Sequence, residues 1–259
     1  MGLPLTYRRA NPLSFPGSRK PGFDPTHPAA QGMVGSLGAS CFPVGTTYFD
    51  LLTLKSLHLS GTLAAVINGV IGPGFTSTGF FNSSILATNT SPGRTWALIC
   101  FFTTSPNANT FMDSSSQVNG LICVSGSFSI KINGTTLGGI ALTTGVPYFL
   151  AGSGYSAIGY NLLALNLRTG VIQTQTGTTT SSFATSGGFI SWGTLTGFVY
   201  GPCSYTPTYL SMPQLLLWAQ RPWDFWYPPT VESLIFDVLS TTAPSGAKAT
   251  WRTLVGAGI

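Results

Sequence analysis

Carboxylates and imidazoles, the groups that most enzymes use for acid–base chemistry, are scarce in this sequence. Its 259 residues include six Asp and Glu residues and two His residues. Glycoside hydrolysis needs two carboxylates on opposite sides of the scissile bond, and none of the strands expected below carries two. Asp224, Glu232 and Asp237 form the nearest group, and we expect them to make surface or cap hydrogen bonds. The sequence therefore predicts no catalytic residues and no enzyme activity.

The two histidines lack the neighbours of a nucleophilic site. A serine triad needs a His that is oriented by a carboxylate. His27 lies between Thr26 and Pro28, and His58 lies in a Leu-Lys-Ser-Leu-His-Leu segment that suits a structural imidazole. Gly152 and Gly154 match part of a dinucleotide-binding loop, but no helix is expected after them, so we predict a turn and no cofactor.

Metal ligands are equally sparse. Asp113, which precedes three serines and Asn119, is the one plausible nucleus for calcium. A single carboxylate binds calcium weakly, so we expect a hydrogen-bonded turn there. The four cysteines show no CxxC spacing, which argues against zinc; we expect mostly buried free thiols at Cys41, Cys100, Cys123 and Cys203.

Aromatic side chains offer a route to carbohydrate binding, because sugars stack on exposed rings. Trp192, Tyr205 and Tyr209 lie in a region rich in turn residues, and Tyr155 and Tyr160 lie in another. Aromatic residues of a β-sandwich mostly fill its core. A sugar platform formed by the first three residues is therefore an alternative hypothesis to a purely structural role.

Charge is the second unusual feature of the composition. Asp, Glu, Lys and Arg make up 7% of the chain, and none occurs between Arg168 and Arg221, whereas about a quarter is usual. Surface charge normally keeps soluble domains apart. A chain with so little of it is expected to work packed against other subunits, including copies of itself.

The basic residues concentrate in a Pro-rich N-terminal arm, residues 1–30. Its six prolines prevent a helix, while Phe15 and several leucines supply apolar anchors. We predict that the arm lies on a partner, and that an acidic protein surface suits it better than nucleic acid does, because the segment is short and lacks a nucleic-acid-binding fold. The partner-binding residues predicted in the arm are Arg8, Arg9, Phe15, Arg19 and Lys20.

Residues 31–229 read as short β segments separated by turns. Asn133-Gly134 is a typical hairpin turn, and the one expected helix spans 211–218. The pattern predicts an all-β antiparallel jelly-roll β-sandwich with an extended N-terminal arm and a C-terminal tail, residues 230–259. Strands are expected at 46–52, 95–103, 121–124, 128–132, 148–151, 161–167, 171–176, 189–192, 198–200 and 233–239.

Two further features bear on the organisation of the chain. Trp223 to Tyr227 places four aromatic residues in five positions between prolines, which predicts a rigid cap on the sandwich. No apolar stretch reaches the roughly 20 residues that cross a bilayer, and we see no signal peptide. We therefore expect no membrane partner and synthesis in a cytoplasm.

Several segments in order along the chain resemble one protein family. Residues 23–34, Phe-Asp-Pro-Thr-His-Pro-Ala-Ala-Gln-Gly-Met-Val, are similar to the opening of concanavalin A-like (laminin G-type) jelly rolls encoded by tailed bacteriophages. Asp50-Leu51 with Gly69 and residues 71–73 resembles the next stretch, and residues 93–98 resemble the first core strand. Gln214-Leu215-Leu216 followed by Arg221-Pro222-Trp223 is similar to the family's close.

The resemblance implies a structural protein of the phage virion. Together with the low charge and the basic arm, it leads us to expect a non-enzymatic capsid decoration or cement protein that contacts the major capsid protein or other virion subunits. The alternative is a lectin-like receptor-binding protein of a tail or head fibre, with a glycan as its ligand. Localisation on the phage particle surface follows from either hypothesis.

Overall fold

The computed structural model of the chain describes residues 13–16, 24, 26–27, 30, 39–44, 47–50, 56–57, 61–64, 71–72, 74–77, 81–86, 90–113, 117–185, 189–192 and 197–228. All of these residues belong to a compact unit that ends at Pro228. The strand expected at 233–239 lies outside the described residues. The division into an arm, a sandwich and a tail at residues 30 and 229 stays a prediction.

The described part of the chain forms β-strands and one helix. In chain order these are β1 (Ala39–Val44), β2 (Thr47–Asp50), β3 (Ser56–Leu57), β4 (Gly61–Ala64), β5 (Gly74–Ser77), β6 (Phe81–Leu86), β7 (Gly93–Phe102), β8 (Ala108–Met112), β9 (Gly120–Val124), β10 (Ser127–Ile132), β11 (Thr135–Ala141), β12 (Pro147–Tyr155), β13 (Gly159–Asn166), β14 (Ile172–Thr178), β15 (Phe189–Trp192), β16 (Phe198–Thr206) and α1 (Met212–Gln220).

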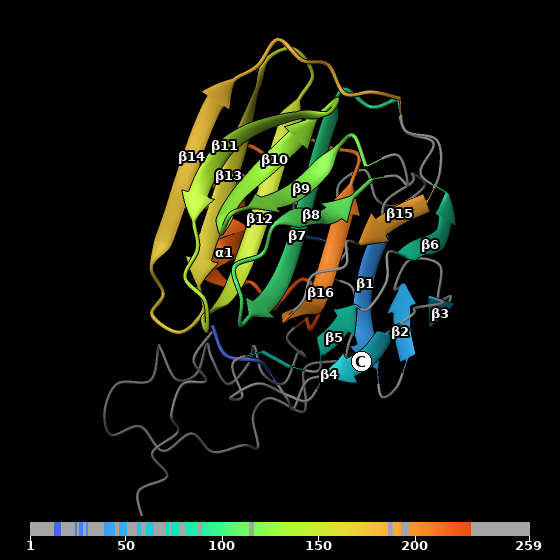
Figure 1. Ribbon diagram of the computed structural model, residues 1–259, viewed down its shortest axis with the longest axis vertical. Coiled ribbons are helices and arrows are strands. Elements are labelled where there is room, and N and C mark those ends of the chain that lie inside the picture. Colours follow the sequence, from blue (N-terminus) through green and yellow to red (C-terminus); the bar gives the residue numbers. More distant parts are fainter. Residues whose placement is uncertain are drawn as a thin grey trace, which may run out of the picture. The chain divides into compact units, whose positions relative to one another are not determined.

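The strands form two antiparallel sheets, which confirms the predicted all-β sandwich (Figure 1). The larger sheet has the order β14-β13-β12-β7-β16-β1-β2-β3, and β5 also pairs with β16 and with β4. The smaller sheet has the order β11-β10-β9-β8-β15-β6. Every strand predicted between residues 46 and 200 overlaps an observed strand.

The inner core lies between the two sheets. Along β7, alternate side chains, including Trp96, Leu98 and Cys100, point into it, as expected from the period of two in a strand. Side chains such as Phe111 from β8 and Ile130 from β10 meet them from the smaller sheet. The two sheets are therefore held together mainly by buried apolar surface.

A second core covers the other face of the larger sheet. The remaining side chains of β7, such as Ala97 and Ile99, pack there with Leu215 and Trp218 of α1. Because both faces are covered, all but one of the ten residues of β7 are buried. The central strands of this sheet are thus a middle layer, between the smaller sheet on one side and α1 with the aromatic residues that follow it on the other.

A β-bulge in β16 changes which of its residues face the inner core. Tyr200 is paired with Cys100, but Cys203 is paired with Leu98, so one extra residue at Gly201-Pro202 shifts the register. The shift reverses the alternation, and Tyr200 and Cys203 both enter the inner core. The strand therefore continues to Thr206, where the sequence predicted an end at Tyr200.

Local sequence signals account for the turn and the helix. Asn133 and Gly134 have φ values of 48° and 81°, as a type I′ turn requires, and the hairpin predicted there joins β10 to β11. At the start of α1, the N–H and the hydroxyl of Ser211 both donate to Gln214 Oε1, at 2.9 Å each. Pro213 occupies the first turn, where its missing N–H has no intrahelical partner to lose.

Candidate functional site

The residues that follow α1 form an aromatic cap, defined here as Trp223, Phe225, Trp226 and Tyr227. All four side chains are at most 2% exposed, which confirms the predicted rigid cap. Trp226 Nε1 donates to Ser204 Oγ at 2.8 Å and so ties the cap to the larger sheet. The cap is a structural element, because its rings are not available to stack on a ligand.

Part of the N-terminal arm docks on this cap. The Phe15 ring meets Trp223 and Tyr227 edge-on, at 5.3 Å between centroids in each case. Trp223 Nε1 donates to the Leu13 carbonyl oxygen at 3.0 Å. Phe15, predicted as a partner-binding anchor, thus packs on its own domain, while Arg8, Arg9, Arg19 and Lys20 lie outside the described residues.

His27 is a second contact between the arm and the cap. Its ring lies 5.0 Å from Trp218 and 5.1 Å from Phe225, measured between centroids. Burial lowers the pKa of His27 to about 4, although the carboxylates of Asp24 and Asp224 oppose that shift. The imidazole is therefore neutral at pH 7 and packs as an aromatic ring, which agrees with a structural role.

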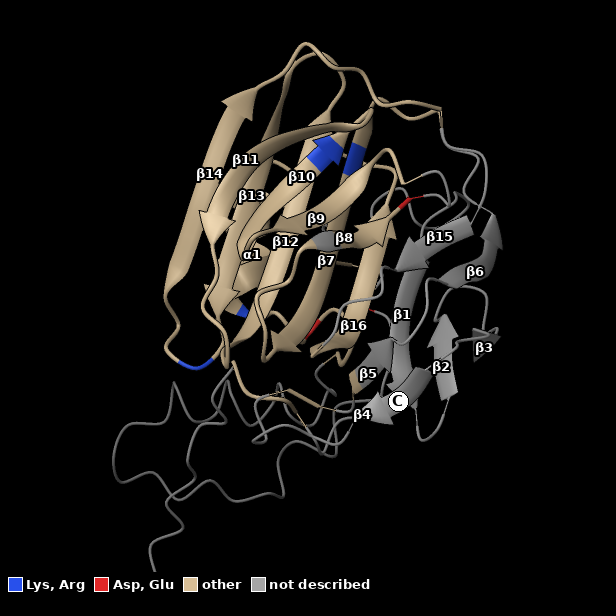
Figure 2. Ribbon diagram, viewed as in Figure 1, with Lys and Arg blue, Asp and Glu red and all other residues tan. Residues whose placement is uncertain are grey.

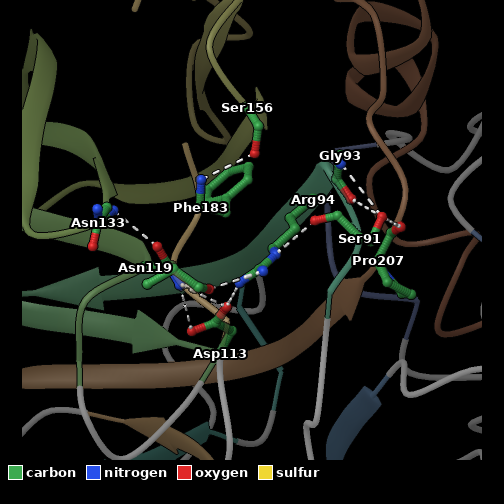
Figure 3. A network of polar contacts seen from close by, with 10 residues as sticks. Ser91, Gly93, Arg94, Asp113, Asn119, Asn133, Ser156, Phe183 and Pro207 are labelled. Atoms are coloured by element: carbon green, nitrogen blue, oxygen red, sulfur yellow. Dashed lines mark hydrogen bonds and ion pairs between the residues drawn. The ribbon is translucent and has the colours of Figure 1, made fainter. Parts of the chain in front are cut away.

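A buried ion pair links the two sheets at one end of the sandwich (Figure 3). The Arg94 guanidinium, on β7, pairs with the Asp113 carboxylate just after β8, and both side chains are at most 1% exposed. Arg94 also donates to Ser91 O at 3.2 Å and to Ala184 O at 3.0 Å. Its guanidinium carbon lies 4.7 Å from the centre of the Phe183 ring.

Asn119 completes this network from the smaller sheet. Its side-chain Nδ2 donates to Asp113 Oδ2 at 3.2 Å and to Ala184 O at 3.1 Å. Its side-chain Oδ1 accepts from the Asn133 N–H at 2.9 Å. The expected hydrogen bonding of Asp113 is confirmed, and residues 114–116 of the predicted turn lie outside the described residues. The sequence did not reveal that Arg94, 19 residues earlier, neutralises the carboxylate and occupies the place where a cation would bind.

The three residues of the predicted sugar platform do not form one surface. Tyr205 is fully buried in the inner core, so the prediction that it belongs to an exposed platform is wrong. The strand continues through the bulge at Gly201-Pro202 and carries Tyr205 inward. Tyr209 is half-buried and accepts a hydrogen bond from Asn161 Nδ2 at 2.8 Å, and the side chain of Trp192 lies outside the described residues.

The carboxylates near the termini have local partners. Asp224 lies 3.6 Å from Arg221, and Asp24 Oδ1 accepts from the Thr26 N–H at 2.9 Å and from its hydroxyl at 2.6 Å. Glu232, Asp237 and His58 lie outside the described residues. The prediction that the chain is not an enzyme stays a prediction. Gly152 and Gly154 lie inside strand β12, so the prediction of a turn at these two residues is wrong; the turn follows at residues 156–158 and leads into β13.

Three thiols are buried in the inner core. Cys100, Cys123 and Cys203 are free and fully buried, which confirms the expectation for these three; the side chain of Cys41 lies outside the described residues. Burial raises the pKa of Cys123 to about 11 and that of Cys100 well above its usual value. Within the ranges that the structure describes, no three His, Cys, Asp or Glu residues gather as a metal site.

Few residues of the described domain are charged (Figure 2). Its most buried charges, Arg94 and Asp113, neutralise each other inside. Lys131 is half-buried, while Arg168 and Arg221 are exposed. Among the described residues no helix is long and apolar enough to cross a membrane. The described residues thus form a β-sandwich that exposes few charged side chains.

Comparisons with known proteins show a similar fold among solved structures but assign no family. No protein-family model and no curated protein matches the sequence. Among solved structures, the binding domain of botulinum neurotoxin serotype D superposes with a TM-score of 0.51 and 11% identity, covering 70% of this chain and 50% of that one. The chain thus spans about half of that domain.

Two further structures are similar at lower scores. A protein of unknown function from Shewanella oneidensis MR-1 gives a TM-score of 0.43 and 15% identity, over 68% of this chain and 89% of that one. The enzymatically active domain of tailspike protein 2 of bacteriophage CBA120 gives 0.42 and 16%, over 62% and 29%. The 11% identity to the neurotoxin domain shows a shared fold alone, and the two lower-scoring structures carry no argument, so the resemblance to phage concanavalin A-like jelly rolls stays a hypothesis.

Proposed function

We propose that this chain is a non-enzymatic assembly subunit of a tailed-phage particle, a decoration or cement protein that binds other virion subunits. The observation that carries the proposal is the almost uncharged exterior of the domain. Monomeric soluble domains use mixed surface charge to resist association. In this domain the ion pair between Arg94 and Asp113 is buried, so it adds no charge to the surface. Burial of neutral polar faces at subunit junctions would stabilise a shell by mass action. The phage part of the proposal comes from the sequence resemblance.

The arm supports the same role and divides it between two segments. Leu13 and Phe15 hold the arm against the domain through Trp223 and Tyr227. Residues 1–12, which include Arg8 and Arg9, are therefore covalently joined to an anchored point. We propose that these two arginines bind an acidic surface on the major capsid protein, with the anchor limiting the entropy lost on binding.

The test separates attachment from folding. Deletion of residues 1–12 should leave the melting temperature unchanged, because Leu13 and Phe15 remain, yet should abolish binding to shells assembled from the major capsid protein of the same phage. Arg8→Ala/Arg9→Ala should weaken binding as well. The matched control is Arg168→Ala/Arg221→Ala, which removes the same charge from exposed positions of the domain. Equal binding by all variants would contradict the role of the arm, and no binding by the parent would contradict the proposed function.

Carbohydrate binding is the second candidate function. The domain that superposes at a TM-score of 0.51 is named as a neurotoxin binding domain, and the half-buried rings of Tyr155 and Tyr209 meet edge-on, 5.9 Å apart, at the end of β12. A glycan array probed with the intact protein tests this function. Binding that is lost in Tyr209→Ala but retained in Tyr209→Phe would favour a receptor-binding role, since the phenylalanine keeps the ring.

A further inference from the structure

Within the described part of the chain, strand β14 is an open edge of the larger sheet. It pairs with β13 on one side, and no strand of the described part of the chain pairs with its other side. Figure 1 shows it as the outermost strand, on the side opposite β1 to β3. An open edge presents unpaired N–H and C=O groups and can pair with a strand of another molecule.

Two hydrogen bonds show which backbone groups face the open side. Asn166 N–H donates to Val171 O at 2.9 Å, and Thr179 N–H donates to Ile158 O at 3.2 Å. Both pairs continue the register of β13 and β14, in which hydrogen-bonded and non-hydrogen-bonded pairs alternate. The odd-numbered residues of β14 therefore bond to β13. The N–H and C=O groups of its even-numbered residues point to the open edge.

The even-numbered residues also favour strand pairing by their side chains. They are Ile172, Thr174, Thr176 and Thr178, all exposed and all β-branched, which suits an extended backbone. The strand has no charge and no proline, and it carries neither blue nor red in Figure 2. Natural edge strands usually carry such groups as protection against association, so β14 lacks the usual protection.

The neighbouring edge of the smaller sheet is protected, which makes the contrast specific. Strand β11 borders β14 and contains a bulge that involves Gly138, with φ of 72°. The N–H of Gly139 donates to Gln175 Oε1 at 2.6 Å, so a β14 side chain blocks this edge. One edge on this side of the sandwich is closed by a bulge and a side chain, while the other is open.

We propose that β14 pairs with β14 of a second copy of this chain. The two strands run antiparallel about a twofold axis at Gln175, and the two larger sheets become one continuous sheet. Thr174 then lies opposite Thr176 of the second copy, and Ile172 lies opposite its Thr178. In this register each outward N–H and C=O of the four even-numbered residues gains a partner, and the Thr–Thr pairs add a favourable cross-strand contact.

Charge selects both the occupant and the orientation. Two copies of an uncharged strand do not repel each other. Arg168 lies exposed in the turn before β14, and residues 179–182 after the strand carry no charge. A parallel pair would bring the two Arg168 side chains together, whereas an antiparallel pair places each beside the neutral Thr and Ser residues of the other copy. The same surface on both molecules also makes a closed dimer.

Strand β14 would be one surface used in the proposed assembly, and its role in a particle rests on that proposed function. Two strands of seven residues bury less than the roughly 1,200–2,000 Å² of a stable interface. The isolated dimer is therefore weak and concentration-dependent. Other contacts in a particle would strengthen it.

Two double variants of the full chain test the pairing by sedimentation over a range of protein concentrations. Thr174→Lys/Thr176→Lys places Lys opposite Lys in the proposed register, and the dissociation constant of the dimer should rise at least about tenfold. Thr174→Lys/Thr176→Glu places Lys opposite Glu, so its dimer should persist. Both variants change exposed side chains, so both should melt within a few degrees of the parent, which makes each a folding control for the other.

Each outcome decides the inference. A monomeric parent up to about 100 µM, where a micromolar dimer would form, overturns it. So does a lysine double variant that dimerises like the parent, since another surface would then be responsible. Loss of dimers in both variants would contradict the antiparallel register. A parent that dimerises through β14 but binds no shell contradicts only the proposed virion role, and a monomer that binds shells contradicts only this inference.

Discussion

Phe15 packs edge-on against Trp223, with 5.3 Å between the ring centroids and 65° between the ring planes. The contact joins a residue of the N-terminal arm to the aromatic cap that ends the described domain. Trp223 Nε1 reinforces it by donating to Leu13 O. The two ends of the domain thus hold each other, and the stability of the cap depends on residues that the sequence assigned to partner binding.

Trp223→Ala should lower the free energy of unfolding by about 3–5 kcal/mol, because it empties a buried aromatic site. Trp223→Phe should lower it by less, since it keeps a ring and removes mainly the bond to Leu13, worth about 1 kcal/mol. Urea denaturation of the full chain measures both values. If Trp223→Ala unfolded like the parent while losing adhesion to glycans, the cap would be a binding surface.

Asp113→Ala should destabilise the domain by about 3–5 kcal/mol, because it leaves the Arg94 guanidinium buried without its counter-ion. The double variant Arg94→Met/Asp113→Leu should recover much of that loss, since no buried charge remains. Addition of calcium or of a chelator should not move the melting temperature of the parent. A calcium-dependent rise in that temperature would contradict the assignment of Asp113 to a structural ion pair.

Acidification should weaken the docking of the arm. The pKa of His27 is about 4 in the folded chain against an ordinary value of 6.5, so the unfolded state binds the proton more tightly between these values. Stability is therefore fully present above about pH 6.5 and falls as the pH is lowered toward 4. His27→Phe should remove this component from a series of thermal melts. An unchanged pH profile in that variant would show that His27 is not the titrating group.

Period-two patterns and turn residues predicted much of this fold. Asn133-Gly134 fixed a hairpin because both residues adopt positive φ. The sequence did not predict seven of the observed strands, β1, β3, β4, β5, β6, β8 and β11, and it ended β16 too early. Two of these failures have local reasons. β11 carries Gly138-Gly139, which weakens its pattern, and the second half of β16 follows Gly201-Pro202, a pair that usually ends a strand.

The site was harder to predict than the fold. The partner of Asp113 is Arg94 on another sheet, and nothing local to either residue signals the pair. Tyr205 looked accessible because its neighbours are turn residues, whereas the bulge turns it inward. Phe15 was predicted to bind a partner, but it packs on Trp223 of its own domain. These two residues lie far apart in the sequence, so local patterns could not predict their contact.

The cysteines of the inner core give this domain a built-in reporter of its own opening. Thiolates react with alkylating agents and thiols do not, and burial raises the pKa of Cys123 to about 11. We expect no alkylation of Cys100, Cys123 or Cys203 by iodoacetamide in the native protein at pH 8 over hours, and rapid labelling in denaturant, as followed by mass spectrometry. Prompt labelling of these three residues without denaturant would contradict their burial.

Labelling kinetics would measure the rate at which the folded domain opens, which equilibrium melting does not give. Cys100 belongs to the larger sheet and Cys123 to the smaller one, so neither thiol meets solvent until the layers part. The rate of their alkylation would therefore report the average rate at which the two sheets separate. In a particle whose neighbouring subunits hold the two sheets together, these thiols would be alkylated more slowly than in the free protein.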